Sequence, residues 1–99
     1  MTSEKYSFKA KIWLWKGNGA WHFVTVPKKI STEIKEKYGK NARGWGSHPV
    51  SVTIGKTTWY TSIFPESKSG TYLLPIKMAV RKAEGVQADD DVKCALMLQ

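Results

Sequence analysis

Apolar residues at every second position are the feature that most constrains the fold of this chain. Val50, Val52 and Ile54 alternate with polar residues, and a Gly-Lys pair follows them at 55–56. A period of two places alternate side chains on one face of a β-strand, and glycine at the first turn position suits a type II′ hairpin. The predicted register pairs Ile54 with Thr57, Val52 with Trp59 and Val50 with Thr61.

The N-terminal part alternates in the same way and predicts a second hairpin. Ala10, Ile12 and Leu14 fall on one face of the first strand, and Trp13 and Trp15 fall on the other. A three-residue turn at 17–19 keeps both faces consistent, whereas a two-residue turn would mix them. The predicted pairs are Lys16 with Ala20, Trp15 with Trp21, Leu14 with His22, Trp13 with Phe23, Ile12 with Val24, and Ala10 with Val26.

Two short helices are expected between the strands. Ser31 is suited to cap a helix over 31–38, and Gly85 is suited to end a second helix over 77–84. Short segments at 71–74 and 92–98 add two strands, for a total of about six. The fold class is therefore all-β with two short helices, and curling into a small barrel would protect both edge strands. The expected core contains Phe8, Ala10, Ile12, Val24, Val52, Trp59, Cys94 and Leu96.

Length and composition predict one domain, with a core that runs from about residue 6 to residue 98. The single cysteine, Cys94, excludes a disulfide within the chain and fits a reducing cytoplasm. No apolar run approaches the roughly 18 residues of a membrane span, and no signal-peptide segment precedes the first strand. We therefore expect a cytoplasmic protein without a membrane partner, and we favour a monomer.

Several segments taken together resemble a known family. They are WHFVTVP at 21–27, GWGS at 44–47, TTWYTSIFP at 57–65, and GTYLLPIK at 70–77 with VRKAEG at 80–85. Over residues 8–98 the chain resembles the bacterial and archaeal domain-of-unknown-function family numbered nineteen-oh-five. The resemblance implies a double-split β-barrel, the architecture class of the AbrB-like and antitoxin DNA-binding domains, and no established biochemical activity.

One turn departs from the pattern of that family. The family usually has a Gly-Asp turn before the last strand, and this chain has three aspartates at 89–91. Aspartate adopts a positive φ less readily than glycine. We therefore expect this turn to differ in shape.

No residue pattern predicts catalysis or a metal site. The Gly-Lys-Thr sequence at 55–57 resembles the end of a phosphate-binding loop, but Val50 stands where that loop needs a glycine, and a strand follows it. His22, His48 and Cys94 are too few and too scattered to form a metal site. We therefore expect a protein that is not an enzyme and that holds no cofactor or metal.

Basic and aromatic residues provide the first candidate binding site. The net charge is +8, and residues 1–48 carry +7 of it because they contain ten Lys and Arg residues but only three Glu. Aromatic rings beside ammonium groups suit stacked bases and phosphates. The alternative, which we favour, is that a helix covers these rings as a second core layer, because four exposed aromatic residues would promote aggregation. The candidates are Lys9, Lys11, Lys16, Trp13, Trp15, Trp21 and Phe23.

A second candidate site combines a basic loop with the second predicted helix. Lys77 and Arg81 lie four residues apart and share one helix face. With the loop they would form a cationic pocket for a phosphate or a carboxylate. The alternative is that Arg81 donates hydrogen bonds to backbone carbonyls and ties the helix to a strand end. The loop residues are Lys40, Arg43, Trp45, Ser47 and His48.

These features favour binding over catalysis. The leading function is an interaction module for a protein partner, and the alternatives are weak, sequence-independent nucleic-acid binding and a small-anion pocket. An exposed apolar patch would favour a protein partner. Coplanar cations at Lys9, Lys11 and Arg43 would favour nucleic acid. A concave pocket joining Trp45 to the cations of the second helix would favour a small anion.

Overall fold

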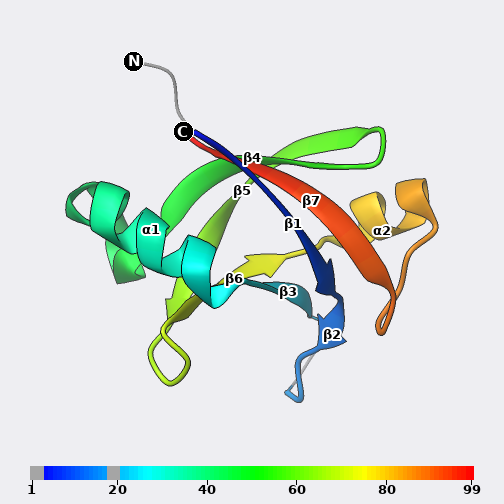
Figure 1. Ribbon diagram of the computed structural model, residues 1–99. Coiled ribbons are helices and arrows are strands. Elements are labelled where there is room, and N and C mark those ends of the chain that lie inside the picture. Colours follow the sequence, from blue (N-terminus) through cyan, green and yellow to red (C-terminus); the bar gives the residue numbers. More distant parts are fainter. Residues whose placement is uncertain (1–3, 18–20) are drawn as a thin grey trace.

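The computed structural model describes residues 4–17 and 21–99. Within them, the strands form one antiparallel sheet in the order β1-β7-β4-β5-β6-β3-β2, which curls into a barrel-like shape (Figure 1). No described helix is long and apolar enough to cross a membrane. The strands are β1 (Lys5–Lys11), β2 (Trp13–Leu14), β3 (His22–Val26), β4 (His48–Ile54), β5 (Thr57–Glu66), β6 (Thr71–Pro75) and β7 (Asp91–Leu98).

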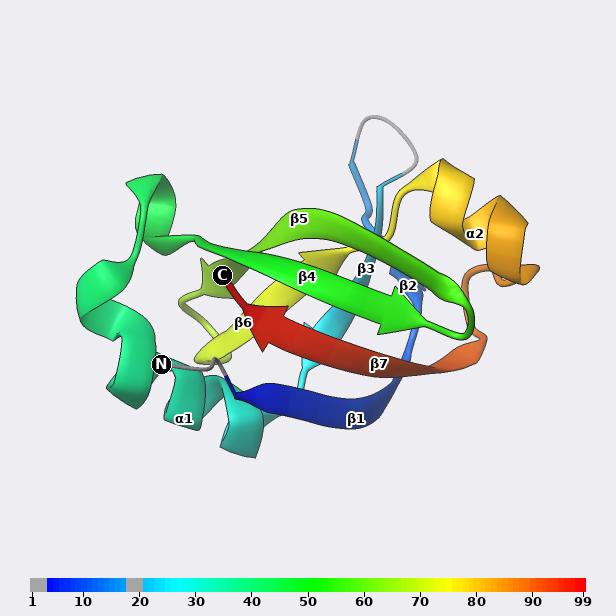
Figure 2. The same cartoon turned by 90° about the horizontal axis from the view of Figure 1, so that it is seen from above.

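Two short α-helices lie at opposite ends of this barrel, and both views show them far apart (Figures 1 and 2). They are α1 (Lys28–Tyr38) and α2 (Met78–Glu84). Ile34 of α1 and Val80 of α2 are buried, so each helix contributes to the core. Two 3-10 turns, Gly39–Asn41 and Gly44–Gly46, connect α1 to β4. The domain is mostly β with two short helices, as the sequence predicts.

Ile12 divides the first predicted strand into β1 and β2, and this division allows the sheet to curl. β1 pairs with β7, whereas β2 pairs with β3 near the other end of the strand order. The Ile12 N–H donates to the carbonyl of Asp90 at 2.9 Å, and its own carbonyl accepts from the N–H of Asp89 at 2.8 Å. One continuous segment therefore supplies both edges of the sheet.

The β4–β5 hairpin has the predicted register. Val52 pairs with Trp59, and the pairs on either side of it also match the prediction. Gly55 takes a φ of 58°, and Lys56 is not one of the residues with a positive φ. This combination belongs to the predicted type II′ turn, in which only the first central residue needs a positive φ.

The first hairpin has the predicted register only near its turn. Trp13 pairs with Phe23, and the N–H of Trp15 donates to the carbonyl of Trp21 at 2.9 Å. The predicted pair of Lys16 with residue 20 lies outside the described residues. The expectation that pairing continues to Ala10 is wrong, because the chain turns away at Ile12. The observed partners are Val92 for Ala10, Leu74 for Val24 and Tyr72 for Val26.

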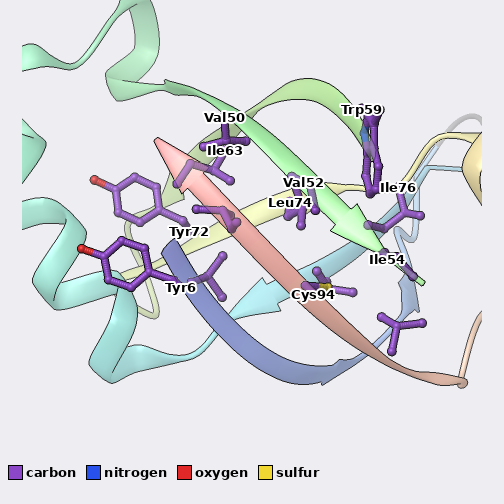
Figure 3. Close-up of a cluster of buried hydrophobic side chains, with 14 of the residues drawn as sticks. Tyr6, Val50, Val52, Ile54, Trp59, Ile63, Tyr72, Leu74, Ile76 and Cys94 are labelled. Atoms are coloured by element: carbon purple, nitrogen blue, oxygen red, sulfur yellow. The ribbon is translucent and has the colours of Figure 1, made fainter. Parts of the chain in front are cut away.

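The core lies inside the curled sheet, where inward-facing residues of the strands meet (Figure 3). Of the eight predicted core residues, six are buried, and Phe8 and Ala10 are half-buried against the same cluster. The buried six are Ile12, Val24, Val52, Trp59, Cys94 and Leu96.

The α1 helix begins one turn earlier than predicted, so Ser31 is not its N-cap. The Ser31 side chain is buried, and its hydroxyl donates to the carbonyl of Val26 at 2.9 Å. The same oxygen accepts from the N–H of Tyr72 at 3.1 Å. Ser31 therefore ties the helix to β3 and β6. The α2 helix ends at Gly85, whose φ of 64° confirms the predicted glycine cap.

Candidate binding site

Three tryptophan rings cluster around Phe23, and the four residues lie on strands β2 and β3 or directly beside them in the chain. The ring centroid of Phe23 lies 5.3 Å from that of Trp13, 6.1 Å from that of Trp15 and 6.0 Å from that of Trp21. The Trp21 and Phe23 rings are stacked, with an angle of 10° between their planes. The indole N–H of Trp13 donates to Oγ1 of Thr25 at 3.0 Å. These contacts hold the rings in fixed positions.

This cluster lies on the outer surface of the sheet. Val24 and Val26 face the core, so the alternation of β3 directs Phe23 and Trp21 outward. Trp15 is 46% exposed and Trp21 is 58% exposed. The expectation that a helix covers the cluster is wrong, because both described helices lie at the ends of the barrel (Figures 1 and 2).

Strands β5 and β6 extend the cluster into an open apolar hollow of about 360 Å³. Phe64 pairs with Leu73, and Leu73 pairs with Thr25 of β3. The neighbouring strands thus bring Phe64, which is 41% exposed, to the edge of the ring cluster. We call this surface the aromatic face. Its residues are Trp13, Trp15, Trp21, Phe23, Phe64 and Leu73.

Sequence reasoning did not include Phe64 or Leu73 among the candidates. Their position depends on the order of strands β5, β6 and β3, which no local pattern reveals. One signal was available. Phe64 and Leu73 occupy outward positions beside the buried residues Ile63 and Leu74, so each is an apolar residue on a face that usually carries polar residues.

A second hollow of about 410 Å³ adjoins the aromatic face at Trp21, which is a lining residue of both hollows. Lys77 and Arg81 lie together in its lining, as their spacing predicts. Tyr60 and Met78, which sequence reasoning did not select, are exposed there. We call it the cationic hollow. Its lining residues include Trp21, His22, Tyr60, Lys77, Met78 and Arg81.

Arg81 also ties its helix to a strand end through a backbone carbonyl, which is the structural role that the sequence suggested as the alternative to anion binding. Its Nε donates to the carbonyl of Ile76 at 3.1 Å, which ties α2 to the end of β6. Its Nη1 lies 3.4 Å from Nε2 of His22, and the Ile76 N–H donates to the carbonyl of His22. These contacts fix the guanidinium at the wall of the cationic hollow and use only part of its N–H donors.

The other candidate cations lie on different parts of the molecule. Lys11 forms an ion pair with Asp91 at 3.6 Å, and its Nζ donates to the carbonyl of Asp89 at 3.1 Å. Lys9 stands opposite Lys93 in the β1–β7 ladder. Arg43 belongs to the segment between α1 and β4, at the α1 end of the barrel (Figure 2). Lys9 and Lys11 therefore share strand β1, and Arg43 lies on a separate segment.

Trp45 lies in the same segment as Arg43 and is 93% exposed. Its φ of 66° is in the left-handed region, which is unfavourable for a residue with a side chain. Both views place this segment at the opposite end of the barrel from α2 (Figures 1 and 2). The structure therefore does not bring Trp45 together with Lys77 and Arg81 in one cavity.

His48 is part of the interior and not of a surface site. It is 2% exposed, and its ring meets the edge of the Tyr72 ring at a centroid distance of 5.6 Å. Its Nε2 has no hydrogen-bond partner among the described residues. Burial lowers the pKa of His48 and raises the pKa of Tyr72. Figure 3 shows the hydroxyls of Tyr6 and Tyr72 pointing to the same side of the core.

The described residues contain no group of three or more His, Cys, Asp or Glu side chains that could hold a metal ion. Cys94 is buried, and burial raises the pKa of its thiol to about 12. A thiol with so high a pKa is a poor nucleophile at neutral pH.

Fold and site define a small barrel-like β domain with an exposed aromatic face. A family model described as Domain of unknown function (DUF1905) matches residues 8–96, and the chain belongs to this family. The comparison with curated proteins found no match. No activity comes with the family description, so the function has to be argued from the surface.

Proposed function

We propose that this domain is not an enzyme but a binding module that docks a polypeptide partner on its aromatic face. The observation that supports the proposal is an exposed, concave group of large rings on a small domain. Contiguous apolar surface of this kind marks interaction sites on soluble proteins. Tryptophan side chains such as Trp15 and Trp21 are also among the residues that contribute most to binding energy at protein interfaces.

The aromatic face is ordered before any partner arrives. Phe23 contacts all three tryptophan rings, Trp13 also contacts Trp15, and Trp13 donates a hydrogen bond to Thr25. A surface that is already ordered loses little side-chain entropy on binding, so more of the contact energy appears as affinity. This feature supports binding of a flexible peptide segment by a rigid surface.

The proposed module acts as a monomer in the cytoplasm. Its single cysteine, Cys94, is buried, so it is inaccessible for a disulfide to a second chain. A domain that needs no disulfide suits a reducing compartment.

Selection from a phage-displayed library of random peptides tests this proposal. We expect the selected peptides to carry an aromatic or large aliphatic residue. Substitution of a central interface tryptophan typically costs about 2 kcal/mol or more, so Trp21→Ser should weaken binding about thirtyfold or more. Trp45→Ser is the matched control, because it removes an exposed tryptophan at the other end of the barrel. Equal losses in both variants, or no loss in Trp21→Ser, would contradict the proposal.

Weak nucleic-acid binding is the second candidate. The exposed rings of Trp15 and Trp21 could stack with bases, and the net charge of +8 would attract phosphates. The test is fluorescence anisotropy with single- and double-stranded oligonucleotides at two salt concentrations. Dissociation constants of about 10⁻⁴–10⁻⁶ M that rise steeply with salt are expected for this function. No signal at low salt with about 100 µM protein would reject it.

Charge-reversal variants show which surface of the domain carries any nucleic-acid binding seen in this titration. Changing Lys9, Lys11 and Arg43 together to Glu should abolish the binding if the basic N-terminal half carries it. The corresponding changes at Lys56 and Lys68 should have less effect. An equal loss in both sets would show general attraction to a basic protein instead of a nucleic-acid site.

A further inference from the structure

Trp21 lines two hollows of different chemistry. On one side it lines the apolar hollow with Trp15 and Phe64. On the other side it lines the cationic hollow with Lys77 and Arg81. A ligand that lies over the exposed indole therefore reaches an apolar site and a cationic site at the same time.

The cationic hollow has positive charge that no neighbouring acid neutralises. None of the described residues that line it is an aspartate or a glutamate. Glu84, which shares α2 with Arg81, is engaged elsewhere, because its carboxylate accepts from Oγ1 of Thr57 at 2.5 Å and from the N–H of Lys56 at 3.3 Å. The hollow is thus suited to an anion supplied by a ligand.

Arg81 is oriented for such a role. Its contacts with Ile76 and His22 hold the guanidinium at the wall, and the donors that they do not use are available to a ligand. A planar guanidinium recognises a carboxylate through paired hydrogen bonds, and a fixed guanidinium loses less entropy when it does so. Lys77 adds a second positive charge to the same hollow.

Resting on the proposed function, we infer that the partner is an acidic polypeptide segment. An apolar side chain of the segment occupies the aromatic face, and a carboxylate a short distance along the chain binds Lys77 and Arg81 in the cationic hollow. The net charge of +8 complements such a partner. This inference specifies the chemistry of the ligand and makes the cationic hollow the site that selects it.

The distribution of charge favours a polypeptide over a nucleic-acid strand. Among the described residues, two cations without an acid, Lys77 and Arg81, line the cationic hollow, whereas the hollow beside Trp13 and Trp15 holds one cation and one acid. The acid is Glu66, which lines that hollow together with Lys16. A nucleic-acid strand carries a phosphate at every residue and would place one beside this carboxylate. A peptide can carry its acid at one end only.

Calorimetric titration with two peptides tests the inference. Both are pentapeptides with blocked ends and a central tryptophan, which is flanked by aspartates in one and by asparagines in the other. We expect the acidic peptide to bind about threefold to tenfold more tightly, which is the range for one or two partly exposed ion pairs. Both peptides should lose affinity in Trp21→Ser, because the aromatic face supplies their common contact.

Two variants with the same change in net charge separate the cationic hollow from general attraction. Lys77→Gln removes a cation of the hollow, and its side chain makes no capping hydrogen bond to α2. Lys82→Gln removes an exposed cation of the same helix that does not line the hollow. The affinity ratio of the two peptides should fall in Lys77→Gln, where Arg81 alone is left to bind the carboxylate, and should be retained in Lys82→Gln.

The outcomes distinguish the two proposals. If neither peptide binds, the proposed function fails together with this inference. If both peptides bind with equal affinity, or if Lys77→Gln keeps the ratio, the aromatic face remains a peptide site and the anion site is rejected. If a short single-stranded oligonucleotide displaces the acidic peptide and binds more tightly, the partner is a nucleic acid and the inference is overturned.

Discussion

Burial of His48 makes the stability of the domain depend on pH. In the folded state its pKa lies below the ordinary value because burial disfavours the charged imidazolium. In the unfolded chain the same group titrates near about 6.5. As the pH falls below that value, the unfolded chain takes up the proton first, so the free energy of unfolding decreases. Above about pH 6.5 His48 is neutral in both states, so the domain does not lose this part of its stability.

The variant His48→Gln should lack this part of the pH dependence. As the pH falls below about 6.5, wild-type protein should lose up to about 1.4 kcal/mol more per pH unit than the variant. Urea unfolding of both proteins at several pH values measures the difference. Parallel curves for the two proteins would show that His48 is protonated in the folded state as readily as in the unfolded chain.

Asp89 occupies a turn position where glycine would be more favourable. Its φ is 77°, while its N–H donates to the carbonyl of Ile12 and its carbonyl accepts from Lys11. Both contacts use the backbone, so Asp89→Gly preserves them. Relief of the left-handed strain outweighs the added flexibility of glycine, and we expect a gain of about 0.5–1 kcal/mol in unfolding free energy. Thermal unfolding checks this, and a loss of stability in the glycine variant would contradict it.

At the scale of the elements, Glu84 joins α2 to the β4–β5 turn through Thr57 and the N–H of Lys56. Glu84→Ala should lower the free energy of unfolding by about 1 kcal/mol, the typical net value of such hydrogen bonds. Glu36→Ala, at an exposed position of α1, is the matched control and should change stability by less than about 0.5 kcal/mol. Equal effects in urea unfolding would mean that the Glu84 contacts add nothing to stability.

Local patterns predicted the strands, the β4–β5 register and the Gly85 cap, because each depends on residues close in sequence. The local patterns did not predict the break at Ile12. Residues before Ile12 pair with β7, and residues after it pair with β3. Partner choice depends on contacts between distant parts of the chain, which alternation does not encode. The start of α1 was misplaced for a related reason. Ser31 uses its hydroxyl for β3 and β6 and not for a helix cap.

Only those parts of the candidate site that depend on local spacing could be predicted from the sequence. The register of β2 and β3 placed Trp13, Trp15 and Trp21 together, and helical spacing placed Lys77 beside Arg81. The exposure of the rings and the addition of Phe64 follow from strand order and from helices that lie at the barrel ends. Neither can be read from local spacing.

Across the whole molecule, buried apolar residues should contribute more to the free energy of unfolding than exposed ones do. Ile63 is fully buried and Phe64, its neighbour on β5, is part of the aromatic face. Ile63→Ala should lower the free energy of unfolding by about 2–5 kcal/mol, and Phe64→Ala by about 1 kcal/mol. Urea unfolding measures both. A larger loss for Phe64 would assign the aromatic face to folding and not to binding.

The central claim is that the aromatic face binds polypeptide, and the indole N–H signals of the tryptophans report on it directly. The measurement is a series of ¹⁵N–¹H correlation spectra recorded while a peptide selected on the folded domain is added. We expect progressive shifts for the indoles of Trp15 and Trp21 and for the backbone amide of Phe64, with the Trp45 indole unchanged. Shifts at Trp45 without any at Trp15 and Trp21 would contradict it.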